Sequence, residues 1–348
     1  MLYIVIALSF ILSLILTPMV KKFAVRIGAL DYPNARKVHQ YVMPRMGGLA
    51  IFISFVIGFL VFLPQTYTLW PILLGAIIIT ATGMLDDLYQ LTARGKLTLQ
   101  LLAAGVTVIG GVQLEFITLP FIDERVEFGY WAIPITIIWI VAITNAINLL
   151  DGLDGLAAGV SAIALFTISM LAVMMGNPLL ALIGFLLFGS TVGFLAYNFH
   201  PAKIFMGDTG ALFLGYMISV ISIMGLFKNA TIFSLIVPII ILGVPILDTV
   251  FAIIRRMVQK KPISAPDKFH IHHCLIRLGL THRQTVMLIY LMSAMFSLAA
   301  ILFTRATMWG STAILIALII LVELIVEITG LISKNYRPLL NLISKVTV

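Results

Sequence analysis

Charged residues are scarce in this chain of 348 residues: only 10% are Asp, Glu, Lys or Arg, whereas 61% are hydrophobic. So apolar a composition excludes a soluble globular domain and indicates an integral membrane protein with many spans. No polar stretch is long enough to form a soluble domain, so we expect one membrane-embedded domain over residues 1–348. The one cysteine, Cys274, excludes an intramolecular disulfide framework and a cysteine-rich metal site.

The net charge of +8 does not indicate nucleic-acid binding. In a membrane protein, surplus Lys and Arg more often set the topology or contact anionic lipids, so membrane lipids are the expected partners and nucleic acid is not. No basic segment precedes the first apolar run, and residues 2–20 are therefore predicted to be a retained span rather than a cleaved signal peptide.

Long, continuous apolar runs predict membrane helices rather than a β-barrel, whose strands would alternate in polarity. The fold class is therefore all-α, with about eleven transmembrane helices separated by charges, prolines and glycines. The predicted spans are residues 2–20, 46–63, 70–85, 97–114, 131–149, 156–175, 179–197, 211–227, 231–254, 285–304 and 311–332.

Lys and Arg are divided unequally between the two faces of this eleven-span arrangement. All but three of the 22 lie on the face that carries the first loop and the C-terminal tail; the exceptions are Arg125, Lys228 and Arg305. The positive-inside rule therefore places the N-terminus outside and the C-terminus in the cytoplasm. All six histidines and five aspartates beside the spans fall on the same cytoplasmic face, although Lys and Arg alone set the topology.

Carboxylates beside membrane spans are functional candidates by default. Asp86 and Asp87 follow the predicted span 70–85. Two adjacent carboxylates suit a shared Mg²⁺, or a general base beside an electrostatic partner. The alternative is a solvated helix end, although a helix C-terminus favours cations.

The segment Asn148-Leu-Leu-Asp151-Gly-Leu-Asp154-Gly155 spaces oxygen ligands three residues apart, which places them on one face of a helix. Such ligands fit Mg²⁺, which proteins usually hold with one or two carboxylates plus substrate phosphates. A simple turn explains one Asp-Gly pair but not two.

The segment Phe205-Met-Gly-Asp208-Thr-Gly210 opens another predicted span. Asp208 either presents a carboxylate to a metal-bound phosphate or caps the helix that follows. The Phe205 ring either stacks on the flat base of a ligand or only packs against neighbouring side chains.

The longest and most basic cytoplasmic loop contains three histidines in the segment His270–His273. They suit a transition metal, anionic phosphates or plain solvation, and the surrounding cations favour phosphates. Asp248, within the predicted span 231–254, is either functional or paired with Arg255 or Arg256. A second basic loop either contacts a lipid phosphate or only sets the topology; its residues are Arg36, Lys37, His39 and Arg45.

The order of these motifs resembles the polyprenyl-phosphate N-acetylhexosamine-1-phosphate transferase superfamily. The resemblance implies an enzyme that moves a sugar-1-phosphate from a UDP-sugar to a membrane polyprenyl phosphate and releases UMP, with Mg²⁺ as cofactor and Mn²⁺ as a substitute. It also implies a bacterial plasma-membrane protein whose active site faces the cytoplasm, and relatives suggest a homodimer. The matching elements are Asp86-Asp87, Asn148-x-x-Asp151-Gly-x-Asp154-Gly, Asn198 through Gly210, and His270–His273.

Two branches of the superfamily differ in their donor. One makes the first lipid intermediate of peptidoglycan from UDP-MurNAc-pentapeptide; the other uses UDP-GlcNAc and undecaprenyl phosphate to start teichoic acid, lipopolysaccharide O-antigen or related polymers. Residues 31–39 look like the GlcNAc branch, and residues 42–48 read Val-Met-Pro-Arg-Met-Gly-Gly where the peptidoglycan branch usually has Gly-Thr-Pro-Thr-Met-Gly-Gly. The His-Ile-His-His form and the eleventh span with a cytoplasmic tail favour the same branch.

Carried over by motif, the resemblance implies that Asp208 is a Mg²⁺ ligand and that Asp151 lies close to the metal and the pyrophosphate. Asp86 or Asp87 is implied to deprotonate or orient the lipid phosphate. The expected substrate-binding residues are Asn148, Asp154, Asn198, Phe205, His270, His272, His273, Lys96, Arg36, Lys37 and His39.

A transporter or lipid flippase with intramembrane carboxylates is the alternative from another class. It would need polar groups near the bilayer midplane and, often, paired broken helices. The polar residues here gather at one face and no internal repeat is visible, so the transferase is favoured.

Overall fold

The computed structural model describes residues 2–33, 41–62, 69–118, 125–227, 236–260, 262, 269–331 and 336–341. The predicted substrate-binding residues Arg36, Lys37 and His39 lie outside these ranges. The described helices are α1 (Leu2–Ile27), α2 (Gly48–Phe62), α3 (Trp70–Tyr89), α4 (Ala93–Ile109), α5 (Ala132–Leu150), α6 (Leu156–Met174), α7 (Pro178–Asn198), α8 (Gly207–Ser222), α9 (Ile236–Ile241), α10 (Gly243–Val258), α11 (Ile271–Arg277), α12 (His282–Phe303) and α13 (Met308–Thr329).

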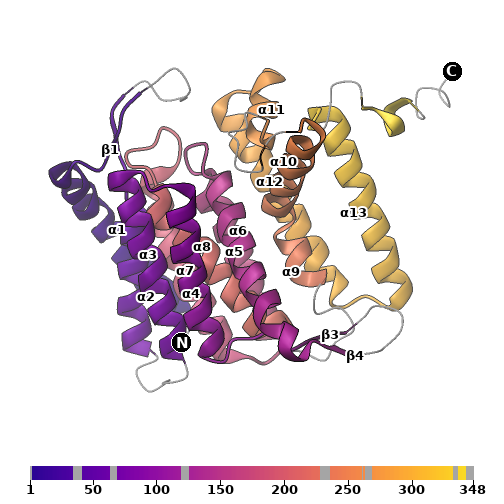
Figure 1. Cartoon of the computed structure of the whole chain (residues 1–348), viewed down its shortest axis with the longest axis horizontal. Helices are drawn as coiled ribbons and strands as arrows, with labels where there is room; N and C mark the ends of the chain where they lie inside the picture. Colours follow the sequence, from indigo (N-terminus) through magenta and orange to yellow (C-terminus); the bar gives the residue numbers. More distant parts are fainter. Residues whose placement is uncertain are drawn as a thin grey trace.

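Four very short strands form two antiparallel hairpins at opposite ends of the bundle (Figure 1). Strand β1 (Leu30–Asp31) pairs with β2 (Met43–Pro44), and β3 (Phe116–Thr118) pairs with β4 (Arg125–Glu127). The β1–β2 hairpin and α11 lie at the upper end of the view, whereas the N-terminus and the β3–β4 hairpin lie at the lower end. The β1–β2 hairpin and α11, which contains His272 and His273, therefore share one end of the molecule.

Eight described helices are long and apolar enough to cross a membrane, namely α1, α3, α5, α6, α7, α8, α12 and α13. The predicted all-α, polytopic membrane class is confirmed. Each of the eleven predicted spans contains a described helix, but the span predicted over residues 231–254 holds two, α9 and α10, separated at Leu242. Pro245 lies in the first turn of α10, where its missing N–H and fixed φ are tolerated.

Helix α8 forms the centre of the bundle and packs between α3 and α5 (Figure 1). All its residues from Thr209 to Ser222 are buried. Its N-terminus meets that of α2 backbone to backbone, since a Cβ on Gly48 would lie only 1.9 Å from the Gly210 Cα. Only glycine allows so close an approach, and this contact brings the start of α8 to the end of the bundle that carries the first loop.

Candidate active site

A cavity of about 720 Å³ opens at this end of the bundle, among helix ends and loops. Its volume lies within the usual range for a small-molecule site. Most of the predicted site residues that the structure describes line it: Asp87, Lys96, Asn148, Asp151, Asp154, Asn198, Phe205, Asp208 and His273. Tertiary packing thus brings together residues from motifs that are more than a hundred positions apart.

Lys96 joins three of these motifs. Its Nζ donates to Asp86 Oδ2 at 2.9 Å and to the Asn148 side-chain oxygen at 3.3 Å, and it lies 3.0 Å from Asp208 Oδ1. The Asn148 amide in turn donates to Asp208. Thr92 positions the lysine because it caps the start of α4, accepting a hydrogen bond from the Gly95 N–H at 3.2 Å. One ammonium thus serves two carboxylates, and this cluster carries a surplus of negative charge.

The adjacent residues Asp86 and Asp87 contact different parts of the site. Asp87 caps the start of α8: its carboxylate accepts hydrogen bonds from the Asp208 N–H at 3.0 Å, the Thr209 N–H at 3.1 Å and the Thr209 hydroxyl at 2.7 Å. A carboxylate is favoured there by the helix dipole. Gly207 is required beside it, because φ is +71° and a Cβ would lie 2.4 Å from Asp87 Oδ2.

Asp208 is therefore not the helix cap. It lies inside the first turn of α8, and its side chain contacts Lys96 and Asn148 instead of the free N–H groups of its own helix. The capping alternative considered for Asp208 is wrong, because Asp87 from α3 already occupies that position. The Asp208 carboxylate is left to face the cavity.

Asp151 ends α5 and presents a carboxylate to the same cavity. Burial, with Asp208 and Asp87 nearby, raises the pKa of Asp151 to about 8, although Arg45 acts in the opposite direction. Among the described residues, none forms a hydrogen bond with this carboxylate. Asp151 and Asp208 thus offer carboxylate oxygens to one cavity, which is the type of ligand that Mg²⁺ prefers.

Arg45, from the loop predicted either to contact a lipid phosphate or only to set the topology, lines the cavity. It lies on the β1–β2 hairpin, where its Nη2 is 2.8 Å from Asp31 Oδ1. The hairpin is joined to the start of α8 by backbone hydrogen bonds, since the Phe205 N–H donates to the Pro44 carbonyl and the Gly47 N–H donates to the Phe205 carbonyl, both at 2.9 Å. Phe205 lines the cavity beside it.

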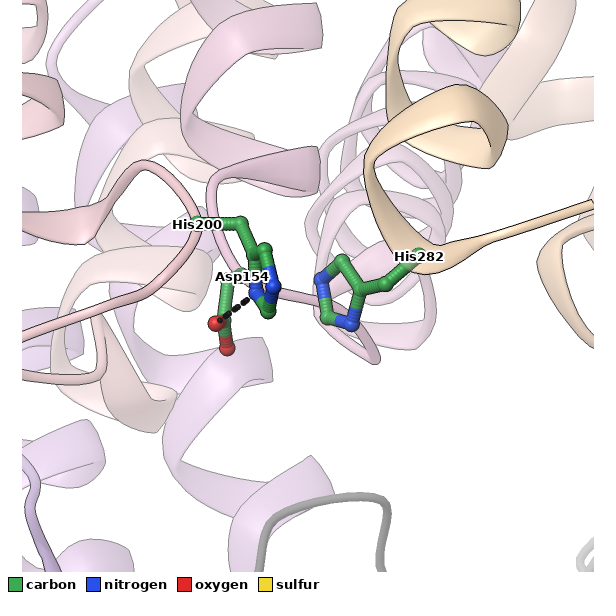
Figure 2. A group of neighbouring side chains, drawn as sticks. All are labelled: Asp154, His200 and His282. Carbon is green, nitrogen blue, oxygen red and sulfur yellow. Dashed lines mark hydrogen bonds and ion pairs between the residues drawn. The ribbon is translucent and has the colours of Figure 1, made fainter.

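A second group of side chains lines another part of the cavity (Figure 2). Asp154 Oδ2 lies 2.8 Å from His200 Nδ1 and accepts a hydrogen bond from the Ala202 N–H at 3.1 Å. His282 stacks on His200 with ring centroids 4.2 Å apart. Neither histidine was among the predicted site residues, although both were predicted on the cytoplasmic face and His200 lies within the motif from Asn198 to Gly210.

Asn198 braces the loop between α7 and α8. Its side-chain oxygen accepts from the Gly155 N–H at 3.1 Å, and its amide donates to the Ile204 carbonyl at 3.0 Å. Although Asn198 lines the cavity, these backbone contacts occupy both ends of its amide. Its position therefore suits holding the loop in place more than contacting a substrate.

The three clustered histidines separate in the structure. His270 is buried, with Nδ1 2.8 Å from Asp248 Oδ2, and Asp248 Oδ1 accepts from the Ile271 N–H at 2.7 Å. His272 packs on Gly152, where a Cβ would lie 2.5 Å from its Nε2, and burial lowers its pKa to about 3. Of these three histidines, only His273 lines the cavity. Asp248, whose role the sequence left open, thus pairs with His270.

Comparison with known proteins identifies the family of this chain. Glycosyl transferase family 4 matches residues 69–226. A probable undecaprenyl-phosphate N-acetylglucosaminyl 1-phosphate transferase from Bacillus subtilis is 54% identical over 96% of this chain and 94% of its own. A decaprenyl-phosphate N-acetylglucosaminephosphotransferase from Mycolicibacterium smegmatis is 34% identical over 93% of this chain and 87% of its own. A phospho-N-acetylmuramoyl-pentapeptide-transferase from Halalkalibacterium halodurans is 33% identical, over 84% and 94% respectively. The resemblance carried by the motifs is therefore confirmed, and the chain belongs to glycosyl transferase family 4.

Proposed function

We propose that this enzyme transfers N-acetylglucosamine-1-phosphate from UDP-GlcNAc to undecaprenyl phosphate, releasing UMP, as the first step of teichoic-acid or related envelope-polymer synthesis. The observation that carries the proposal is the convergence of Lys96, Asp151 and Asp208 on one cavity large enough for a nucleotide sugar. The 54% identical relative is named for this reaction, whereas the relative named for the MurNAc-pentapeptide reaction is 33% identical. UDP-GlcNAc is therefore the favoured donor.

Mg²⁺ is the proposed cofactor, with Mn²⁺ as a substitute, and Asp208 and Asp151 are its proposed ligands. The fit rests on an all-oxygen donor set and on the Asp151 carboxylate, which has no hydrogen-bond partner among the described residues. When bound, the ion would offset charge on the pyrophosphate and on the departing UMP.

The reaction is a phosphoryl transfer, in which positioning and charge matter more than proton abstraction. An oxygen of the lipid phosphate attacks the β-phosphorus of the donor, and the bond from that phosphorus to the bridging oxygen breaks. A phosphate monoester is largely ionised near pH 7, because its second pKa is about 6. A strong base is therefore not required, and Asp86 is proposed to orient Lys96 and the acceptor phosphate rather than to remove a proton.

The remaining side chains divide between positioning and binding. Asp87 is proposed to position Asp208 through the start of α8, because its carboxylate is fully used there. Asp154 and Phe205 are proposed to face the uridine, with His273 near the donor phosphates, since all three line the cavity. Asn198 holds the loop that carries Phe205.

A turnover assay on purified protein tests the function. Radiolabelled UDP-GlcNAc or UDP-MurNAc-pentapeptide is incubated with undecaprenyl phosphate and Mg²⁺, and UMP release is measured. We expect UMP from UDP-GlcNAc alone, with the Asp208→Ala variant, purified in the same way, as the control for contaminating activity. No turnover with either donor would contradict the proposal and revive the transporter alternative.

The proposed location is the bacterial plasma membrane, with the cavity facing the cytoplasm, where a nucleotide-sugar donor is made. In a Cys274→Ser background, a cysteine at Lys203, which is exposed near the cavity, should resist a membrane-impermeant thiol reagent in intact cells. A cysteine at Tyr130, 97% exposed and next to the β3–β4 hairpin at the other end, is the matched control that should react. The reverse labelling pattern would overturn the orientation. The homodimer suggested by relatives stays a prediction.

A further inference from the structure

Figure 2 shows three neighbouring side chains that are potential metal ligands, and all three line the cavity. Asp154 comes from the turn between α5 and α6, His200 follows α7, and His282 is the first residue of α12. One ligand atom from each lies within 4.8 Å of the other two. Two imidazoles and one carboxylate are a ligand set typical of Zn²⁺ and related transition metals.

An independent observation points to a missing ligand here. Among the residues that the structure describes, none forms a hydrogen bond with the buried Nε2 atom of His282. Buried polar atoms of this kind are uncommon, and each calls for an explanation such as an ion. The His282 ring faces that of His200, with an angle of 22° between the ring planes. A bound cation would satisfy this nitrogen.

The backbone around the three ligands is held in place. Thr281 and Gln284 form a capping box that begins α12 at His282. The hydroxyl of Tyr290, also on α12, donates to the Gly155 carbonyl at 2.5 Å, one residue after Asp154. In a tetrahedral site with bonds of about 2.0–2.1 Å, ligand atoms lie about 3.3 Å apart. The present ligand atoms, all within 4.8 Å of one another, would have to move closer together to reach that spacing.

We propose that Asp154, His200 and His282 bind a transition-metal ion of the Zn²⁺ class, at a site separate from the Mg²⁺ site at Asp208 and Asp151. The two sites differ in chemistry, because imidazole favours Zn²⁺ and Co²⁺ whereas an all-oxygen set favours Mg²⁺. All three ligands line the cavity, so water can complete the coordination. A metal ion bound here would compete with the nucleotide-sugar donor for Asp154. This consequence alone rests on the proposed function.

Binding of Co²⁺ to the purified, full-length protein without a histidine tag tests the site directly. With millimolar Mg²⁺ present, we expect one saturable Co²⁺ per chain, with the visible absorption of a low-symmetry site, and displacement by Zn²⁺. His282→Gln and His200→Ala should each weaken Co²⁺ binding at least about tenfold, the lower end of what even an outer-shell partner contributes. His273→Ala, which changes a cavity histidine outside the trio, is the matched control and should bind as the wild type does. The thermal unfolding midpoint of each variant shows that it is folded.

Three outcomes would overturn the site: no saturable Co²⁺ binding, binding unchanged in both the His282 and His200 variants, or binding lost in the His273 variant. A second arm measures UMP release. Zn²⁺ should raise the KM for UDP-GlcNAc in the wild type. In His282→Gln, the same rise should need a Zn²⁺ concentration at least about tenfold higher. Failure of turnover with UDP-GlcNAc would refute the proposed reaction while the Co²⁺ result still decides the metal site, so the two failures are distinguishable.

Discussion

Two clusters of acidic and basic side chains lie at the same end of the molecule but differ in how far their charges are matched. In the cluster around Lys96, two carboxylates share one ammonium, and the cluster opens onto the cavity. In the pair formed by Asp248 and His270, both carboxylate oxygens have a partner, and both residues are buried away from the cavity.

The difference shows how the same residue types perform different tasks. A buried carboxylate is tolerated when it is paired and hydrogen-bonded, as Asp248 is, and such a pair holds structure together. Here it fixes the start of α11, the helix that carries His273 to the cavity. Surplus negative charge that faces a cavity needs a bound cation to stabilise it. Such a cation can in turn hold a phosphate group. Substitutions of four aspartates, with their controls, test this distinction.

Asp208→Asn should have the largest effect. It removes one charge from the unmatched cluster while keeping the shape of the side chain. We expect kcat for UMP release to fall about 10²- to 10³-fold, the size of effect seen when one preorganised electrostatic group is lost. The thermal unfolding midpoint should change little. If the Asp208→Asn variant keeps more than a third of the wild-type rate at saturating Mg²⁺, the unmatched charge is not needed for catalysis.

Asp87→Asn should affect stability and activity together. The α8 cap would lose charge and part of its hydrogen bonding, costing about 1–2 kcal/mol of unfolding free energy, and Asp208 would shift. Thermal unfolding in detergent and UMP release measure the two effects. Asp86→Asn is the neighbouring control, which should lose activity with a smaller fall in the unfolding midpoint. Equal stability of the Asp87 variant and the wild type would refute the capping role.

Asp248→Asn should have a milder effect on catalysis. The amide oxygen can still accept from the Ile271 N–H, but the charge that faces His270 is lost. We expect the KM for UDP-GlcNAc to rise by at most about tenfold through a small displacement of His273. The double variant Asp248→Asn/His273→Ala should have nearly the same KM for UDP-GlcNAc as His273→Ala alone. Both changes act on the same contact between His273 and the donor, so their effects should not add. A loss as large as that of Asp208→Asn would erase the distinction between the clusters.

The smallest expected effect concerns stability rather than activity, and Asp151→Asn should reveal it as a pH dependence of the unfolding midpoint. The folded pKa of about 8 lies above the usual value of about 3.9, so ionisation of Asp151 destabilises the metal-free folded protein as pH rises from 4 to 8. In EDTA, the variant should therefore gain about 2–4 °C in unfolding midpoint over the wild type between pH 5 and pH 8. Mg²⁺ should reverse this gain, because it stabilises the ionised wild type. A difference independent of pH would contradict the assignment.

The helices were largely predictable because long apolar runs allow little else in a membrane. The break at Leu242 and the short helix α11 were not predicted, since both lie where polarity and helix signals are mixed. In the site, Asp208, Asp151 and Lys96 meet as the motifs predicted. The bracing role of Asn198 and the burial of His270 and His272 depend on partners from other segments, which no local pattern contains.

The all-α membrane class follows from the amino-acid sequence, because in lipid each apolar segment must satisfy its own backbone hydrogen bonds. The identity of the carboxylates that face the cavity depends instead on tertiary packing. Asp86 and Asp87 are neighbours on one helix, where successive side chains point about 100° apart. One therefore meets Lys96 and the other the start of α8, and the packing of α4 and α8 against α3 sets these partners.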